Sequence, residues 1–123
     1  MGAQDLTVSV RGYIKSDDRK ISLRIKISET QLKAEQMRLR GVGDKCDGDF
    51  MTLEVSHDTH STIELGMGSR VFVKIPPYFD GKKKRRFSIS TYFVYSATPI
   101  TTRTRSSCLL HRYYLHVSHE ELF

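Results

Sequence analysis

The chain has 123 residues, a formal net charge of +6 and 38% hydrophobic residues. This length supports one modest hydrophobic core and excludes two independent ones. No segment is long and apolar enough to span a bilayer, and the N-terminus lacks the layout of a secretory signal, so we expect a cytoplasmic protein without membrane contact. Cys46 and Cys108 form no Cys-x-x-Cys pair, which favours free thiols over a zinc site or a disulfide.

The charge is unevenly distributed along the chain. Residues 1–80 contain 12 basic and 12 acidic residues, whereas residues 81–123 contain 8 basic and 2 acidic residues. No carboxylate occurs between Asp80 and Glu120. A basic C-terminal segment of this kind indicates a polyanionic partner such as nucleic acid, with solubility as the alternative explanation.

Alternating apolar and polar residues predict the first strands. Leu6 to Ile14 forms one such run, and 21–27 forms the clearest, with an aliphatic residue at every odd position. The turn residues between them predict a hairpin loop over 15–20. Residues 37–42 resume the alternation and predict another strand, while 29–36 is too short to decide between one helical turn and a loop.

The middle of the chain continues the β pattern. Short strands are predicted over 50–55, 61–65 and 70–75, separated by glycine-containing turns. About six short strands with tight connections are typical of a small barrel or sandwich.

Pro76 and Pro77 end this run, because neither can donate a hydrogen bond to a strand ladder. We therefore place a boundary here, with a β-barrel over 1–75 and a basic extension of uncertain structure over 76–123. Within the extension, 87–95 is predicted to be one more strand. The periodicity of 108–117 fits a helix and a strand equally well.

The order of these segments resembles the N-terminal domain of the pelota family of ribosome-rescue factors, relatives of the class 1 translation termination factor. The likeness rests on four segments: Ile21-Ser22-Leu23-Arg24-Ile25-Lys26-Ile27, Met37-Arg38-Leu39-Arg40-Gly41-Val42, Ser61-Thr62-Ile63-Glu64-Leu65 and Gly68-Ser69-Arg70-Val71-Phe72-Val73-Lys74. It covers roughly residues 5–74. The family motif has a Tyr-His pair where this chain has His60-Ser61, and the central and C-terminal domains of the family do not fit within 123 residues.

The resemblance implies a small Sm-like β-barrel that enters the ribosomal A site and contacts messenger RNA in no-go decay and mRNA surveillance. It implies that the loop over 15–20 faces the messenger channel. It also implies a translational GTPase as partner, if the chain is part of a longer pelota-like protein.

Three cations in the predicted loop, Lys15, Arg19 and Lys20, are candidate RNA-binding residues, because cations gain affinity for nucleic acid by releasing condensed counterions. The alternative is a solvated hairpin loop partly neutralised by Asp17 and Asp18. The basic residues of the two strands are weaker candidates, because alternating cations are common on the wet face of a sheet. These are Arg24, Lys26, Arg38 and Arg40.

A second candidate RNA-binding site is the basic run formed by Lys82, Lys83, Lys84, Arg85 and Arg86. It precedes Phe87, Tyr92 and Phe93, so it combines cations for phosphates with aromatic rings for bases. A nuclear-import signal or a solvated charge run explains the same residues.

The sequence indicates no enzyme and no cofactor. It has no nucleophile elbow, no phosphate-binding glycine loop and no convincing carboxylate pair. His57 and His60 would point to opposite faces of a strand, which disfavours a metal site. Besides an RNA-binding domain, a structural or assembly protein of the viral matrix type, with a basic tail for nucleic acid or anionic membrane, stays open.

Overall fold

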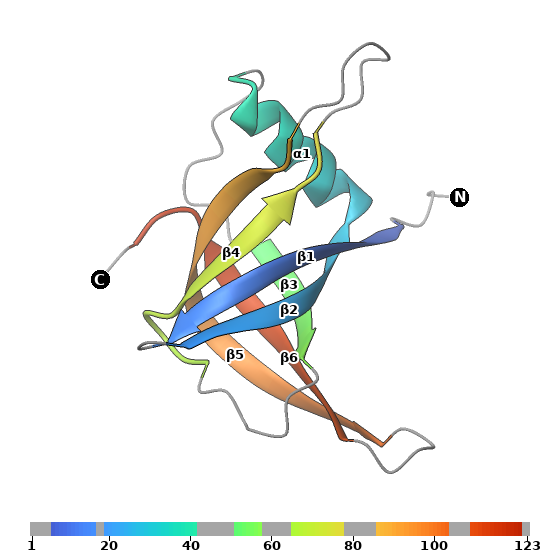
Figure 1. The fold of residues 1–123 in the computed structure, drawn as a ribbon, viewed down its shortest axis with the longest axis vertical. Helices are drawn as coiled ribbons and strands as arrows, with labels where there is room; N and C mark the ends of the chain where they lie inside the picture. Colours follow the sequence, from blue (N-terminus) through green and yellow to red (C-terminus); the bar gives the residue numbers. More distant parts are fainter. Residues whose placement is uncertain are drawn as a thin grey trace.

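In the part of the chain that the computed structural model describes, six stretches form β-strands and one segment rich in helix-forming residues forms a helix (Figure 1). The structure describes residues 6–16, 19–41, 51–57, 65–77, 86–103 and 109–121. The predicted mostly β fold, a small barrel of about six strands, is confirmed. In chain order the elements are β1 (Thr7–Ser16), β2 (Arg19–Ser28), α1 (Glu29–Leu39), β3 (Met51–His57), β4 (Arg70–Ile75), β5 (Ser88–Arg103) and β6 (Leu109–Ser118).

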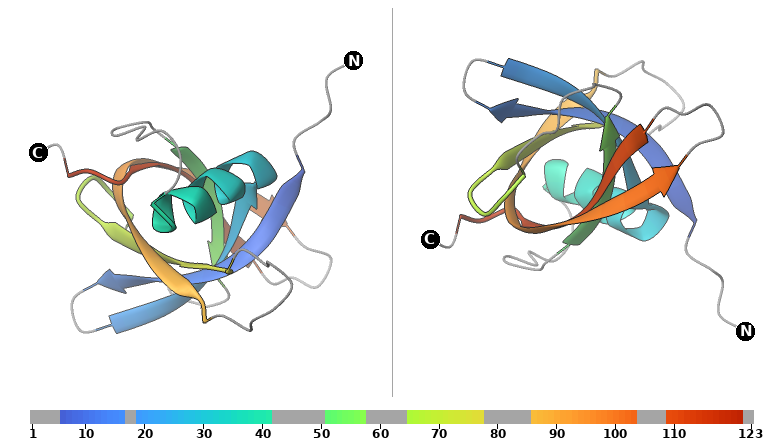
Figure 2. Two further views of the ribbon diagram at one scale, coloured as in Figure 1. Left: turned by 90° about the horizontal axis from the view of Figure 1, so that it is seen from above. Right: turned by 90° about the horizontal axis from the view of Figure 1, so that it is seen from below.

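The strands close into a barrel in the order β1-β2-β3-β6-β5-β4, and β4 pairs with β1 to complete the ring. Every pairing is antiparallel. Figure 2 shows the ring from both ends. Closure satisfies the backbone groups that an open sheet would expose at its edges.

Alternation along the strands places one set of side chains inside the barrel. In β2 the odd positions from Ile21 to Ile27 are buried and the even positions from Lys20 to Lys26 are exposed, as the sequence predicted. The apolar interior is the main stabilising feature of a fold of this size. The buried hydrophobic residues are Val10, Ile14, Ile21, Leu23, Ile25, Ile27, Leu32, Leu53, Val55, Val71, Val73, Ile75, Tyr92, Val94, Leu115 and Val117.

The helix α1 corrects the prediction of a strand over 37–42 and extends the short segment left undecided over 29–36. Ser28 caps its first turn by accepting a hydrogen bond from the backbone N–H of Gln31 at 3.1 Å. The helix ends at Leu39, and Gly41 follows with a positive φ of 73°. The alternation of Met37 to Arg40 misled the prediction, because these exposed positions do not face the core. Figure 2 shows α1 lying across one end of the barrel.

Residues beyond the predicted boundary at 75/76 complete the barrel. β5 pairs with β4, β6 pairs with β3, and Leu115 and Val117 lie in the core. The boundary therefore falls between two hydrogen-bonded strands of one barrel, because the proline pair ends β4 without ending the fold. β5 runs on to Arg103, and the segment over 108–117 forms a strand rather than a helix. The predicted strand over 61–65 lies outside the described residues, apart from Leu65, which is not in a strand.

Candidate nucleic-acid interface

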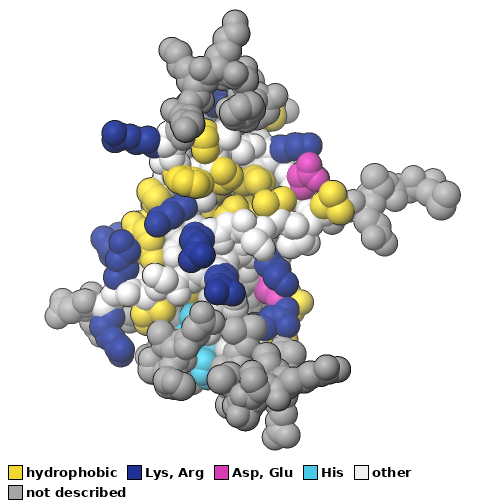
Figure 3. Space-filling model, turned by 45° about the vertical axis from the view of Figure 1, so that its right-hand side comes forward, with side chains coloured by type: hydrophobic (Ala, Val, Ile, Leu, Met, Phe, Trp, Pro, Cys, Tyr) yellow, Lys and Arg dark blue, Asp and Glu magenta, His cyan; other side chains and the backbone are white. Residues whose placement is uncertain are grey.

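The outer surface of the barrel is strongly basic. Glu54 is the only acidic residue within the six strands, whereas Lys and Arg occur in β1, β2, β4, β5 and β6. Figure 3 shows Lys and Arg side chains spread over one side of the molecule with few acidic side chains among them. The strand register therefore produces a cationic surface that the net charge alone does not reveal.

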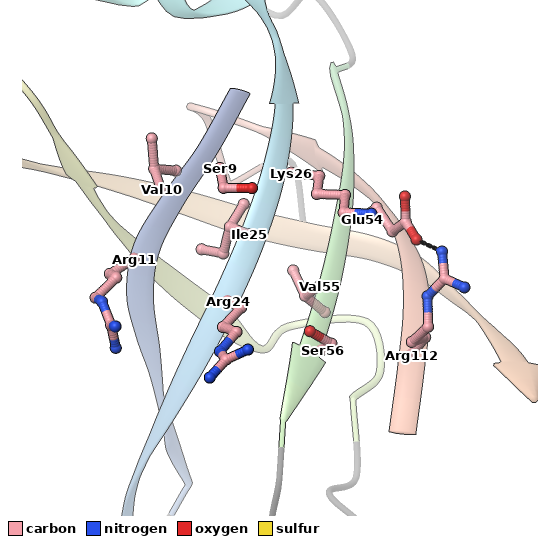
Figure 4. Close-up of a pocket in the computed structure, with 10 residues that line it drawn as sticks. All are labelled: Ser9, Val10, Arg11, Arg24, Ile25, Lys26, Glu54, Val55, Ser56 and Arg112. Carbon is pink, nitrogen blue, oxygen red and sulfur yellow. Dashed lines mark ion pairs between the residues drawn. The ribbon is translucent and has the colours of Figure 1, made fainter. Parts of the chain in front are cut away.

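Four of these cations form what we call the basic face: Arg11, Arg24, Lys26 and Arg112. Arg11 of β1 lies directly opposite Arg24 of β2, Arg24 lies opposite Ser56 of β3, and Ser56 lies opposite Arg112 of β6. One row across four strands thus carries three guanidinium groups (Figure 4). Like charges directly opposite each other in a sheet repel each other and are destabilising as a pair.

Glu54 neutralises part of the basic face. It forms an ion pair with Arg112 and lies opposite Lys26 in the register of β2 and β3. These residues border a surface depression between β1, β2, β3 and β6 (Figure 4). Among the described residues that line the depression, one carboxylate accompanies four cations, a balance that favours an anion.

The three predicted loop cations lie at the ends of β1 and β2, and we call them the hairpin cations: Lys15, Arg19 and Lys20. Lys15 faces Lys20 across the two strands, and all three are exposed. The Nζ atom of Lys20 lies 4.2 Å from the ring centroid of Tyr13, and that of Lys15 lies 5.6 Å from the ring centroid of Phe72. The predicted loop over 15–20 is therefore shorter than expected, because Lys15 belongs to β1 and Arg19 and Lys20 belong to β2, and the strand pairing places the three residues close together.

The second predicted cluster is mostly outside the described residues, which include Arg86 but not Lys82, Lys83, Lys84 or Arg85. Arg86 is exposed and borders a depression beside Gln36 and Pro77. Gln36 donates a hydrogen bond to the carbonyl of Pro76 there, at the α1 end of the barrel. Of the weaker candidates, Arg24 and Lys26 belong to the basic face, whereas Arg38 and Arg40 lie at the end of α1.

Sequence reasoning missed Arg11, Arg112, Tyr13 and Phe72 as candidate binding residues. The alternation of β1 put Arg11 and Tyr13 on the outer side, but only the register shows which residues lie beside them. Arg112 was missed because the periodicity of its segment did not distinguish a strand from a helix.

A separate polar cluster anchors α1 to the barrel. Glu35 is 2% exposed; its Oε1 accepts hydrogen bonds from Ser90 Oγ at 2.5 Å and from Arg38 at 2.6 Å. Burial raises the pKa of Glu35, but hydrogen bonds from His119, Arg38 and Ser90 outweigh this and lower it to about 2. Burial, followed by the charge of Glu35, raises the pKa of nearby Tyr92.

This cluster does not have the order of a catalytic triad. In such a triad the imidazole contacts the serine hydroxyl and the carboxylate orients the imidazole. Here the carboxylate of Glu35 lies between Ser90 and His119 and contacts both. The arrangement holds the helix in place, because it links α1 to β5 and to the chain after β6.

The histidine pair considered from the sequence is not assembled among the described residues. His57 is 2% exposed and stacks against His111, with ring centroids 4.9 Å apart, while His60 lies outside the described residues. No group of three or more His, Cys, Asp or Glu residues in the described ranges is placed to hold a metal ion. Within the same ranges, no helix has the length and apolar character needed to cross a membrane.

No protein-family model and no solved structure matches this chain. The residues quoted for the pelota resemblance fall in different kinds of structure. Ile21 to Ile27 and Arg70 to Lys74 are in strands, Met37 to Leu39 are in α1, and 61–64 lie outside the described residues. The resemblance therefore stays a prediction.

Proposed function

We propose that this protein binds RNA through the basic face and the hairpin cations, mainly by contacts with phosphate groups. The observation that supports this proposal is the row in which Arg11 faces Arg24 and Arg112 follows two strands further on. Such a row lowers the stability of the free barrel by self-repulsion. A bound polyanion would relieve that repulsion and release its condensed counterions.

Binding of this kind depends on shape and charge more than on base sequence. Arginine and lysine side chains that contact phosphates fix the position of a nucleic acid without identifying its bases. No enzymatic step is part of the proposal.

Contact with the ribosomal A site during rescue of stalled ribosomes is a narrower form of the same proposal. It rests on the pelota resemblance of the β2 and β4 segments. In that setting the hairpin cations would reach messenger RNA, and a translational GTPase would be the expected protein partner of a longer chain.

Fluorescence anisotropy with a labelled unstructured RNA, over a salt series, tests the general proposal. Replacing Arg11 and Arg24 together with Gln should reduce the slope of log K against log salt by about 1.4, since each phosphate contact on a single strand contributes about 0.7. The matched control replaces two exposed cations, Lys33 of α1 and its C-cap residue Arg40, with Gln and removes the same charge. Equal effects of the two double variants would show that only the net charge matters.

Co-sedimentation with ribosomes stalled with an empty A site tests the narrower form. The full chain is required, because residues 88–118 form part of the barrel. Wild type should bind, and replacement of Lys15, Arg19 and Lys20 with Ala should weaken binding to ribosomes more than binding to free RNA. Equal affinity for anionic liposomes would instead favour a structural or assembly protein.

A further inference from the structure

Aromatic rings lie on the outer side of the barrel next to the basic face. Tyr13 of β1 is directly opposite Phe72 of β4, and their rings stack with centroids 5.0 Å apart and an interplanar angle of 15°. One strand further on, Phe93 of β5 lies opposite Arg70 of β4, whose guanidinium is 5.6 Å from the ring centroid of Phe93. All three rings are half-buried rather than enclosed in the core.

Each of these rings is accompanied by a cation. Lys20 lies over Tyr13, Lys15 lies near Phe72, and Arg70 lies near Phe93. An exposed cation contributes little to stability by lying over a ring, because water already solvates its charge. A ligand with a flat aromatic group to stack on the ring and a negative charge to pair with the cation can therefore displace each ring–cation contact at little cost.

Close approach of β1 and β4 brings Tyr13 and Phe72 together. A Cβ atom on Gly12 would lie 2.4 Å from the carbonyl oxygen of Phe72, so only glycine fits at this position. Gly12 is buried and adjoins both Arg11 of the basic face and Tyr13 of the aromatic pair. The strand β1 thus connects the basic face to the stacked rings.

We propose that the nucleic acid bound by this protein is single-stranded, with unpaired bases stacking on Tyr13, Phe72 and Phe93 while Lys15, Lys20 and Arg70 move to its phosphates. This inference rests on the proposed function. The faces of bases within a duplex are covered by neighbouring base pairs, whereas a single strand presents them to aromatic side chains. Base stacking tolerates any sequence, so binding of this kind does not depend on base identity.

An ordinary structural explanation is that Tyr13 and Phe72 stabilise the sheet as a cross-strand aromatic pair. This accounts for the pair but not for the cation beside each ring, nor for Phe93 and Arg70 repeating the arrangement on the next strands. The two explanations predict different effects on binding, so they can be separated.

The first measurement uses wild-type protein and compares a labelled unstructured RNA, a DNA of the same sequence and the blunt duplex of each. We expect tighter binding of the single strands than of the duplexes at equal salt. The RNA and DNA arms show whether the sugar contributes. Equal affinity for single strands and duplexes would overturn the inference while leaving the proposed function intact. Binding to none of them would overturn the proposed function itself.

The second measurement uses Tyr13→Leu and Phe72→Leu, which keep an apolar contact between β1 and β4 but remove the aromatic faces. We expect single-strand affinity to fall about tenfold or more for each variant, with duplex affinity and the salt slope unchanged. Tyr13→Phe is the matched control and should keep the wild-type affinity, because it retains the aromatic face and removes only the hydroxyl group. Thermal unfolding of each variant identifies any loss of fold. Equal weakening of single-strand and duplex binding would overturn the inference.

Discussion

His119 Nε2 lies 2.7 Å from Glu35 Oε2, so the chain after β6 contacts the helix that covers one end of the barrel. The contact joins residues 84 positions apart in the sequence. Since Ser90 of β5 contacts the other carboxylate oxygen, Glu35 links α1 to β5 and to the chain after β6.

Removing the charge of Glu35 should weaken the fold. The pKa of Glu35 falls from 4.5 to about 2 in the folded protein, which corresponds to about 3 kcal/mol at neutral pH. We expect Glu35→Gln to lower the free energy of unfolding by that order, measured by urea denaturation. The control is Glu29→Gln, which removes a surface ion pair with Lys33 and should cost a few tenths of a kcal/mol. Similar losses for both variants would contradict an anchoring role for Glu35.

The same carboxylate predicts how stability depends on pH. Because its folded pKa lies below the ordinary value, Glu35 stabilises the fold above pH 4.5, and this contribution is lost as the pH falls toward about 2. The difference in unfolding free energy between wild type and Glu35→Gln should be present above that window and shrink within it. If the free energies of unfolding of the two proteins changed with pH in the same way down to pH 2, the prediction would be contradicted.

Gly12 should not tolerate a side chain. A Cβ there would lie 2.4 Å from the Phe72 carbonyl oxygen and 2.5 Å from Ile25 Cδ1, so Gly12→Ala must displace backbone. We expect a loss of about 1–3 kcal/mol in the free energy of unfolding. Gly66→Ala serves as the control, since no atom lies within 4 Å of its added Cβ. Equal free energies of unfolding for the two variants would show that β1 and β4 move apart to admit a side chain at little cost.

Arg11→Gln should stabilise the free protein while weakening its binding to RNA. Arg11 faces Arg24 across β1 and β2, so its removal relieves like-charge repulsion. We expect a gain of a few tenths of a kcal/mol at low salt, and a smaller gain at high salt because ions screen the repulsion. Denaturation at two salt concentrations measures the gain. A destabilised variant would indicate that Arg11 has a structural role.

Leu115→Ala in β6 should destabilise the barrel as strongly as a core substitution in β3. Leu115 is fully buried although it lies in the segment that the sequence assigned to an extension. We expect a loss of about 2–5 kcal/mol, similar to that of Leu53→Ala in β3. Denaturation of both variants checks this, and a near-neutral Leu115→Ala would place β6 outside the cooperative core.

Much of the β structure could be predicted from the sequence, because side chains alternate between the two faces of a strand. This rule identified β1, β2, β3 and β4 closely and indicated β5. It failed for 37–39, where apolar residues on the exposed part of α1 imitate a strand. It also gave no answer for β6, since short apolar segments fit both periodicities.

The hairpin cations of the candidate site were also predictable, because turn residues mark the loop between two clear strands. The basic face and the aromatic pair were not. Each depends on which residues lie opposite one another across strands, and that register joins Arg11 to Arg112 over a sequence separation that no local pattern encodes.

By itself, the sequence determined a mostly β chain in which each strongly alternating strand has one solvent-exposed and one buried face, since those patterns follow from local periodicity. Only the tertiary structure decided that residues 88–118 close the barrel, that Glu35 is buried at its end, and that three arginines share one row. These features arise from contacts between distant segments, whose energies depend on closure of the whole barrel rather than on any single stretch of residues.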